Sequence, residues 1–153
     1  AVEAIEDLQG RYLFAMDWRD ADAYASTFTE NGVLDYAGGV AQGREAIRTV
    51  INNMRKSEAE RRAKDKSGKW PPRGRHNVTN LVLHIEGDKA SARSYWTQFN
   101  NDNAERSAGI GSYGHYEDEL VKQNGKWLFT KRKIFNEVLK ARTASDSNPA
   151  AFK

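Results

Sequence analysis

The stretch that decides the fold covers residues 114–127 and reads GHYEDELVKQNGKW. Asn124-Gly125 is the strongest short signal for a two-residue hairpin turn, because both residue types tolerate positive φ. The residues on either side suit strands. The sequence therefore predicts two antiparallel strands, over 110–122 and 126–136, joined at this turn.

A second hairpin is predicted just upstream, with strands over 76–86 and 89–100. Glu86-Gly87-Asp88-Lys89 supplies the turn between them. A polar link over 101–109 connects the two hairpins. Together the four strands form a long antiparallel meander.

The first half of the chain shows helical periodicity instead. Three helices are predicted, over 2–18, 21–29 and 43–62, with a short strand over 33–37. The apolar stripe of the third helix follows the i, i+3, i+4, i+7 spacing at Ile47, Val50, Ile51 and Met54. Because helices and strands are segregated along the chain, the fold class is α+β. We expect a cone-shaped, curved antiparallel sheet packed against three N-terminal helices, with an apolar pocket between them.

Length and composition fit a single domain of 153 residues. We expect the domain over 1–140 and a flexible tail over 141–153, because that tail is rich in Ser, Asn, Pro and Ala. The chain has no cysteine, which excludes disulfides and thiolate chemistry. It shows no apolar run of membrane-spanning length and no signal-like segment. We therefore expect a cytoplasmic protein without a membrane partner.

The net charge of +3 hides a local concentration of basic side chains. Residues 55–75 hold nine Lys and Arg and only three Asp and Glu. Three interpretations remain open: a solvated helix end and loop, attraction of an anionic substrate, or a nucleic-acid patch. No nucleic-acid motif accompanies the charges, so no nucleic-acid partner is expected.

Asp17 and His76 are the residues with the clearest chemical potential. Asp17 ends the first predicted helix, and His76 opens the strand after the third. A carboxylate beside an imidazole fixes the tautomer of the ring and stabilises its protonated form, so the ring can accept a proton. An acidic residue at a helix C-terminus is unfavourable with the macrodipole, which suggests a functional reason for Asp17.

Four segments in this order and spacing carry a resemblance to a known family. The chain resembles the SnoaL-like branch of the nuclear transport factor 2-like superfamily, which has a cystatin-like fold. That branch includes scytalone dehydratase, a bile acid dehydratase, the lindane dehydrochlorinase, ketosteroid isomerase, polyketide cyclases and lignin diarylpropane formaldehyde lyases. The segments are residues 28–36 (FTENGVLDY), 43–48 (GREAIR), 75–80 (RHNVTN) and 114–127.

The resemblance implies a catalytic site. The dehydratases and the dehydrochlorinase share an Asp at the end of the first helix and a His opening the strand after the third. Asp17 and His76 occupy those places. Scytalone dehydratase polarises its substrate with a Tyr on the early strand, and Tyr36 has the matching spacing. Met16 stands where that enzyme has a Tyr. These enzymes generally use no metal or organic cofactor, so none is expected here.

Six further residues are candidates for lining the pocket and binding the substrate. Aromatic residues of this size also suit a hydrophobic core, and both interpretations remain open for them. The three histidines show neither an i, i+4 pair nor an HExxH pattern, so no metal site is predicted. The six candidates are Trp18, Tyr24, Asn80, Arg93, Trp96 and Tyr116.

These observations predict a cofactor-independent lyase with a closed pocket. Acid–base elimination, by dehydration or by retro-aldol-type loss of a small aldehyde, would act on a hydroxylated, partly aromatic small molecule. The alternatives are an isomerase or cyclase of the ketosteroid-isomerase type, or a non-catalytic ligand-binding or assembly module. We expect a homo-oligomer, a dimer or trimer, formed through the outer face of the sheet.

Overall fold

A computed structural model of the protein describes residues 1–152. The predicted helices are present as α1 (Val2–Asp17), α2 (Ala21–Ser26) and α3 (Arg44–Lys64). Asp20 caps α2, because its side chain accepts a hydrogen bond of 3.1 Å from the backbone N–H of Ala23. Helix α2 ends before Phe28, where the prediction continued it to residue 29. Phe28 and Thr29 belong to the first strand instead.

Six strands form one sheet in the order β2-β1-β6-β5-β4-β3. Four neighbouring pairs are antiparallel, and the β1–β6 pair is parallel. The curved sheet packed against three helices was predicted correctly, but the sheet is mixed rather than wholly antiparallel. The strands are β1 (Phe28–Tyr36), β2 (Gly39–Gln42), β3 (Gly74–Glu86), β4 (Lys89–Asn100), β5 (Gly109–Gln123) and β6 (Lys126–Ile134).

Strand β1 starts five residues earlier than the predicted strand over 33–37, because Asn31-Gly32 forms a bulge inside it. The register with β6 shifts between Phe28 and Val33. A Cβ at Gly32 would lie 2.9 Å from the Cβ of Phe28, closer than atoms can approach. The glycine therefore allows the bend. The short strand β2 was not predicted.

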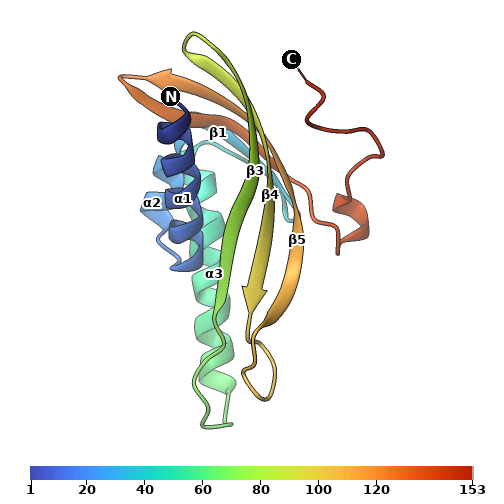
Figure 1. Ribbon diagram of the computed structural model, residues 1–153. Helices are drawn as coiled ribbons and strands as arrows, with labels where there is room; N and C mark the ends of the chain where they lie inside the picture. The colour runs from blue at the N-terminus through green and yellow to red at the C-terminus, as the bar shows by residue number, and fades with distance from the viewer. Residues whose placement is uncertain (153) are drawn as a thin grey trace.

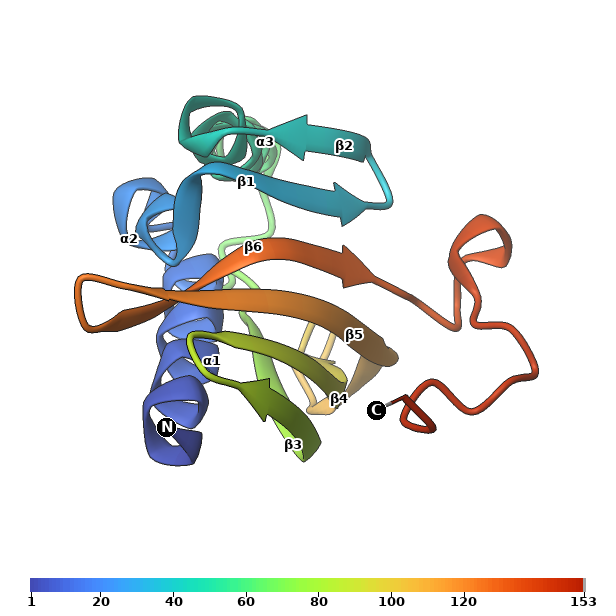
Figure 2. The same cartoon turned by 90° about the horizontal axis from the view of Figure 1, so that it is seen from above.

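The three helices cover one face of the sheet, and the tail from residue 140 lies on the other side (Figure 1). Figure 2 shows the same arrangement from above. The core between helices and sheet is aromatic at its centre. Tyr12 packs against Tyr24, Phe28, Tyr116 and Phe129 with ring centroids 4.6 to 6.2 Å apart.

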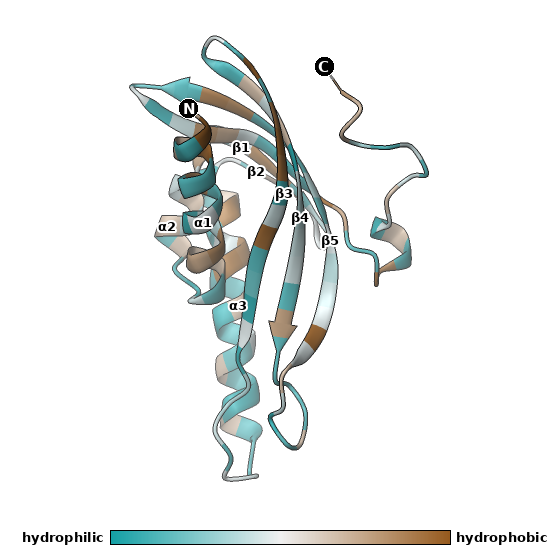
Figure 3. Cartoon of the chain, viewed as in Figure 1, coloured by the Kyte–Doolittle hydropathy of each residue, from teal (hydrophilic) through white to brown (hydrophobic). Residues whose placement is uncertain are grey.

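Helix α3 extends beyond this core together with the ends of β3, β4 and β5 (Figure 1). Its first half buries Ile47 and Ile51. Its second half is hydrophilic (Figure 3) and carries several arginines and Glu58. This extension forms the polar end of the cone. None of the helices in residues 1–152 combines the length and the hydrophobicity needed to cross a membrane.

The tail after β6 contacts the outer side of the sheet at specific points. It contains the short 3₁₀ helix η1 (Lys140–Arg142). Arg142 donates hydrogen bonds to the side chain and backbone of Asp35 and to the carbonyl of Ile134. The predicted flexibility of this tail, and the domain boundary at 140, stay predictions. Lys153 lies outside the described residues.

Candidate active site

The structure brings Asp17 and His76 into direct contact although they lie 59 positions apart. The Nδ1 atom of His76 lies 2.5 Å from Oδ1 of Asp17. The backbone N–H of His76 donates to Oδ2 of the same carboxylate at 2.8 Å. Both side chains are largely shielded, with 14% of the His76 side chain and 4% of the Asp17 side chain exposed. One histidine therefore binds both oxygens of this carboxylate.

The end of α1 presents Asp17 to β3 through a Schellman motif. The N–H of Asp20 bonds to the carbonyl of Ala15, and the N–H of Arg19 bonds to the carbonyl of Met16. Arg19 takes the left-handed position with φ of 55°, where glycine is usual. The Arg19 guanidinium binds the Met16 carbonyl and Glu58 on α3. This arrangement ties the helix end that carries Asp17 to α3.

The geometry of the dyad indicates which ring nitrogen of His76 carries the proton. Because both Asp17 oxygens accept hydrogen bonds, the neutral ring carries its proton on Nδ1. The other nitrogen, Nε2, is then the basic one. Within residues 1–152 Nε2 has no hydrogen-bond partner of its own. The Trp96 ring packs 5.9 Å from the imidazole and closes its inner side.

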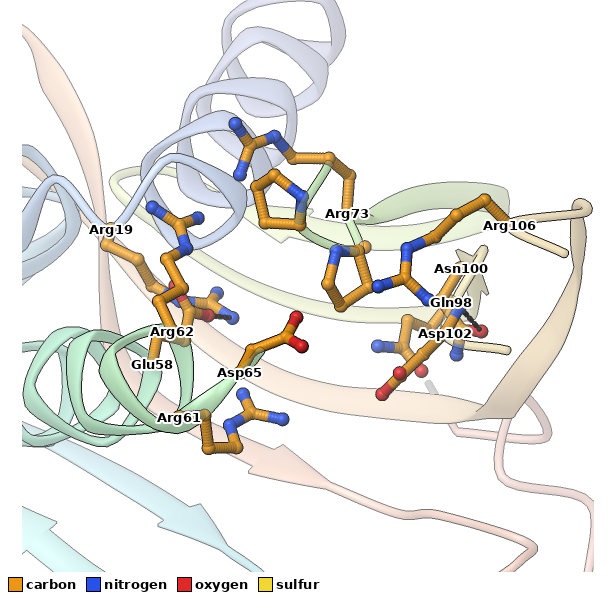
Figure 4. A pocket seen from close by; sticks show the side chains of 13 residues that line it. Arg19, Glu58, Arg61, Arg62, Asp65, Arg73, Gln98, Asn100, Asp102 and Arg106 are labelled. Atoms are coloured by element: carbon orange, nitrogen blue, oxygen red, sulfur yellow. Dashed lines mark hydrogen bonds and ion pairs between the residues drawn. The ribbon is translucent and has the colours of Figure 1, made fainter. Parts of the chain in front are cut away.

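Two cavities of about 380 Å³ and 330 Å³ lie near the dyad, although His76 is in the lining of neither. The smaller is lined by Asp17 itself. The larger, drawn in Figure 4, is lined by Gln98, which pairs with His76 across the β3–β4 ladder. Both cavities have arginine-rich walls. The expectation of an apolar pocket beside the dyad is therefore wrong, because the hydrophilic half of α3 forms one wall.

A third cavity of about 500 Å³ lies between α3 and the β1–β6 part of the sheet. It holds the apolar walls that the sequence predicted, and Tyr36 is among them. The ion pair of Arg19 with Glu58 lines this cavity as well as the two beside the dyad. That pair therefore stands between the polar and the apolar spaces. The apolar lining includes Met16, Tyr24, Leu34, Tyr36, Met54 and Ile134.

The predicted aromatic site residues fall in three different surroundings. Tyr24 lines the apolar cavity, but its hydroxyl is 2.6 Å from that of Tyr12. Trp96 and Tyr116 are buried in the core, stacked with ring centroids 6.1 Å apart. Trp18 lies at the rim of the Asp17 cavity, and the Arg75 guanidinium lies 3.8 Å from its ring centroid.

Two of the predicted pocket residues do not reach the site. Arg93 points to the outer face of the sheet, because odd-numbered residues of β4 face away from the helices. There it bonds the carbonyl of Pro149 and lies over the Phe152 ring. Asn80 sits in a bulge of β3 with φ of 57° and is exposed beside the middle of α1, near Glu6 and Gly10. Neither residue lines the cavities near the dyad or the apolar cavity, and their predicted role in substrate binding stays a prediction.

A buried charge network lies deeper in the cone. Arg132 donates two hydrogen bonds of 2.8 Å to the Asp118 carboxylate, and both side chains are 0% exposed. Gln9 bonds to both residues, and Nη1 of Arg132 is buried without a hydrogen-bond partner within residues 1–152. Burial lowers the pKa of Arg132, but the attraction of Asp118 outweighs it and holds this pKa above its ordinary value. Burial also raises the pKa of Tyr116, which lies beneath the guanidinium.

The structure adds site residues that sequence reasoning missed, namely Arg19, Glu58, Gln98 and Asn100. The Arg19–Glu58 pair joins two helices that are distant in sequence, so no local pattern marks it. Within residues 1–152, no three His, Asp or Glu side chains gather in a way that could hold a metal ion.

Comparisons with known proteins agree with this fold. A family model described as the SnoaL-like domain matches residues 1–133, so the chain belongs to the SnoaL-like family. The superfamily to which this family belongs is the nuclear transport factor 2-like superfamily. A comparison with curated proteins returned no match.

Three solved structures illustrate the likeness. Rv3472 from Mycobacterium tuberculosis, whose function is unknown, is 28% identical with a TM-score of 0.75, over 98% of this chain and 82% of that one. A cystatin-like protein of unknown function from Nostoc punctiforme is 26% identical with a TM-score of 0.69, over 86% of each chain. A Novosphingobium aromaticivorans protein provisionally named scytalone dehydratase is 22% identical with a TM-score of 0.69, over 99% and 94%.

Proposed function

We propose that this protein is a cofactor-independent lyase in which His76 moves the proton. The observation that carries the proposal is the hydrogen-bonded pair of Asp17 and His76, in which Nε2 of the ring has no partner within residues 1–152 and Asp17 lines a cavity. The SnoaL-like family includes many enzymes, and the provisional name of the Novosphingobium protein points to the same reaction class.

In a dehydration, Nε2 of His76 takes a proton from a carbon next to an electron-withdrawing group. The electrons of the C–H bond form a double bond, and the C–O bond on the neighbouring carbon breaks. The departing hydroxyl takes the proton from the imidazolium and leaves as water. Asp17 stabilises the imidazolium between the two steps, so one residue serves as base and then as acid.

The same dyad supports a retro-aldol-type cleavage. Nε2 of His76 then takes the proton of a substrate hydroxyl, and the O–H electrons form the carbonyl of the departing aldehyde. The C–C bond breaks, and the resulting carbanion takes the proton back from the imidazolium. Tyr36 is proposed to donate a hydrogen bond to a substrate oxygen from the apolar cavity.

Product analysis tests the proposal. Aromatic alcohols, lignin dimers and steroids are incubated with the protein, and products are followed by mass spectrometry with an assay for released aldehyde. His76→Ala should lower turnover by about 10²–10⁴. His84→Ala is the matched control, because His84 is an exposed residue of the same strand and should leave turnover unchanged. A product of unchanged mass would identify an isomerase or cyclase instead, and no turnover with any substrate would favour a binding module.

The predicted homo-oligomer is also a proposal. The outer face of β4 and β5 exposes apolar side chains at neighbouring positions, since Phe99 pairs with Ile110 and Thr97 pairs with Tyr113. Tyr95 extends the same patch. A contiguous apolar surface of this kind is typical of protein–protein contact. We propose that a second copy of the chain covers it.

A further inference from the structure

The cavity that Asp17 lines and the larger cavity next to it share a set of arginines. Arg62 and Arg73 line both of them. Figure 4 shows that they come from different elements, Arg62 from α3 and Arg73 from the loop before β3. The cavity that contains Asp17 has five arginine side chains and two carboxylates in its lining.

Most of the other charges in that cavity are already engaged. Asp17 is bound by His76, and Glu58 by Arg19. Arg75 donates to the carbonyl of Gly74 and lies over the Trp18 ring. Within residues 1–152, the side chains of Arg55, Arg62 and Arg73 have no hydrogen-bond or ion-pair partner. An excess of unpaired guanidinium groups therefore faces the space beside the catalytic carboxylate.

Guanidinium groups have a planar fork of N–H donors that matches a carboxylate, and such charge-assisted hydrogen bonds are roughly twice as strong as neutral ones. The larger cavity also contains Asp65 and Asp102, which have no arginine within ion-pair distance. These two carboxylates would repel an extended polyanion, while a ligand with a single charge can approach the arginines without meeting them.

We propose that the substrate carries a carboxylate, which Arg62 and Arg73 bind so that the rest of the molecule extends towards His76. This inference rests on the proposed lyase function and names the substrate class for that site. Gln98 and Asn100 also line the larger cavity, and their side-chain NH₂ groups can donate to a substrate hydroxyl, since their amide oxygens already accept hydrogen bonds. Gln98 lines the same cavity as Arg62 and Arg73 and is the direct cross-strand partner of His76, so it links the arginines to the dyad.

The lysines of the same basic segment have a different position. None of Lys64, Lys66 and Lys69 lines either cavity, and the Nζ of Lys69 is bonded to the carbonyl of Ala104. Their positive charges add to the electrostatic potential around the cavities, but their side chains do not contact the ligand. This difference provides a control with the same loss of charge in the same segment.

Binding of a matched acid and amide tests the proposal. The probes are 3-(4-hydroxyphenyl)propanoate and its neutral amide, titrated at low salt by calorimetry, with the side-chain amides of Gln98 and Asn100 followed by NMR. The acid should bind wild-type protein about tenfold or more tightly than the amide, as expected for one charged hydrogen bond. In Arg62→Gln/Arg73→Gln this preference should fall below about threefold. In Lys64→Gln/Lys66→Gln the preference for the acid should persist. The affinity of this variant for the acid should fall modestly at low salt, and that difference from wild type should disappear at higher salt.

Equal affinity for acid and amide, binding of neither probe, or an equal loss in the arginine and lysine variants would overturn the proposal. Calorimetry that shows tighter binding of a DNA oligonucleotide than of the acid would also overturn it. The readout is independent of turnover, and His76→Ala should bind the acid as wild type does. If acid binding follows this pattern while no substrate is eliminated, the lyase function fails and the carboxylate site stands.

Discussion

Replacing Asp17 by asparagine is the sharpest test of the dyad. The native carboxylate accepts hydrogen bonds from both the backbone N–H and Nδ1 of His76. An asparagine side chain has only one oxygen, and its NH₂ group must face one of these two positions. If the NH₂ faced the backbone N–H, two donors would meet in a site where Asp17 is 4% exposed, at a cost of about 1–3 kcal/mol.

The asparagine therefore turns its oxygen to the backbone N–H and donates its NH₂ to Nδ1. The ring proton then moves to Nε2, which removes the base from the position facing substrate. Loss of the charge that stabilises the imidazolium adds about 1.5–3 kcal/mol. At about 1.4 kcal/mol per factor of ten, the two effects together lower the turnover rate by about 10²–10⁴.

The assay combines steady-state turnover with ¹⁵N NMR of His76, which reports the tautomer directly. Asp20→Asn is the control, because asparagine is an equally good N-cap for α2 and the residue lies just beyond the dyad helix. Retention of the Nδ1–H tautomer in Asp17→Asn would refute this reasoning, as would turnover within about threefold of wild type.

Three other outcomes are expected. Asp118→Asn leaves the buried Arg132 guanidinium uncompensated and should lower the free energy of unfolding by about 3–5 kcal/mol in urea titrations, while Asp35→Asn at the partly exposed pair with Arg142 should cost much less. Tyr95→Glu with Tyr113→Glu should shift the protein to a monomer in light scattering at unchanged melting temperature, and an unchanged mass would contradict contact through the outer face. Burial raises the pKa of three core tyrosines, so the folded protein binds their protons more tightly than the unfolded chain does. The stability that this difference contributes is present below about pH 10 and is lost as the pH rises further. The three residues are Tyr12, Tyr24 and Tyr116. Their phenolate absorbance should appear only when the protein unfolds, and its appearance in the folded protein would contradict their burial.

Local patterns predicted most of the elements, because hairpin turns and amphipathic helices are encoded over a few residues. Asn124-Gly125 forms the predicted turn, with φ of 50° and 79°. The parallel pairing of β1 with β6 left no local sign, because it depends on how the whole sheet closes.

The neighbours of His76 show most clearly where sequence reasoning stops. Counting back from the turn at Gly87 with a regular register would pair His76 with Phe99. The bulge at Asn80 shifts the register between Thr79 and Val82, and the partner becomes Gln98. A one-residue shift exchanges an outward phenyl ring for an inward amide beside the imidazole. The dyad itself was predicted from the family resemblance, because no local sequence pattern indicates that two residues 59 positions apart will be in contact.

The parallel pairing of β1 with β6 also has a consequence for how the protein acquires its shape. Phe28 pairs with Phe129, so the partner of an early strand is synthesised about a hundred residues later. Contacts of such long sequence separation carry a large loop-closure cost and slow the folding of β-rich domains. During synthesis, the helices and β1 have emerged from the ribosome before β6 exists to complete the core. The N-terminal segment that carries Asp17 must therefore wait for β6, and we expect the core to close only after that strand has been synthesised.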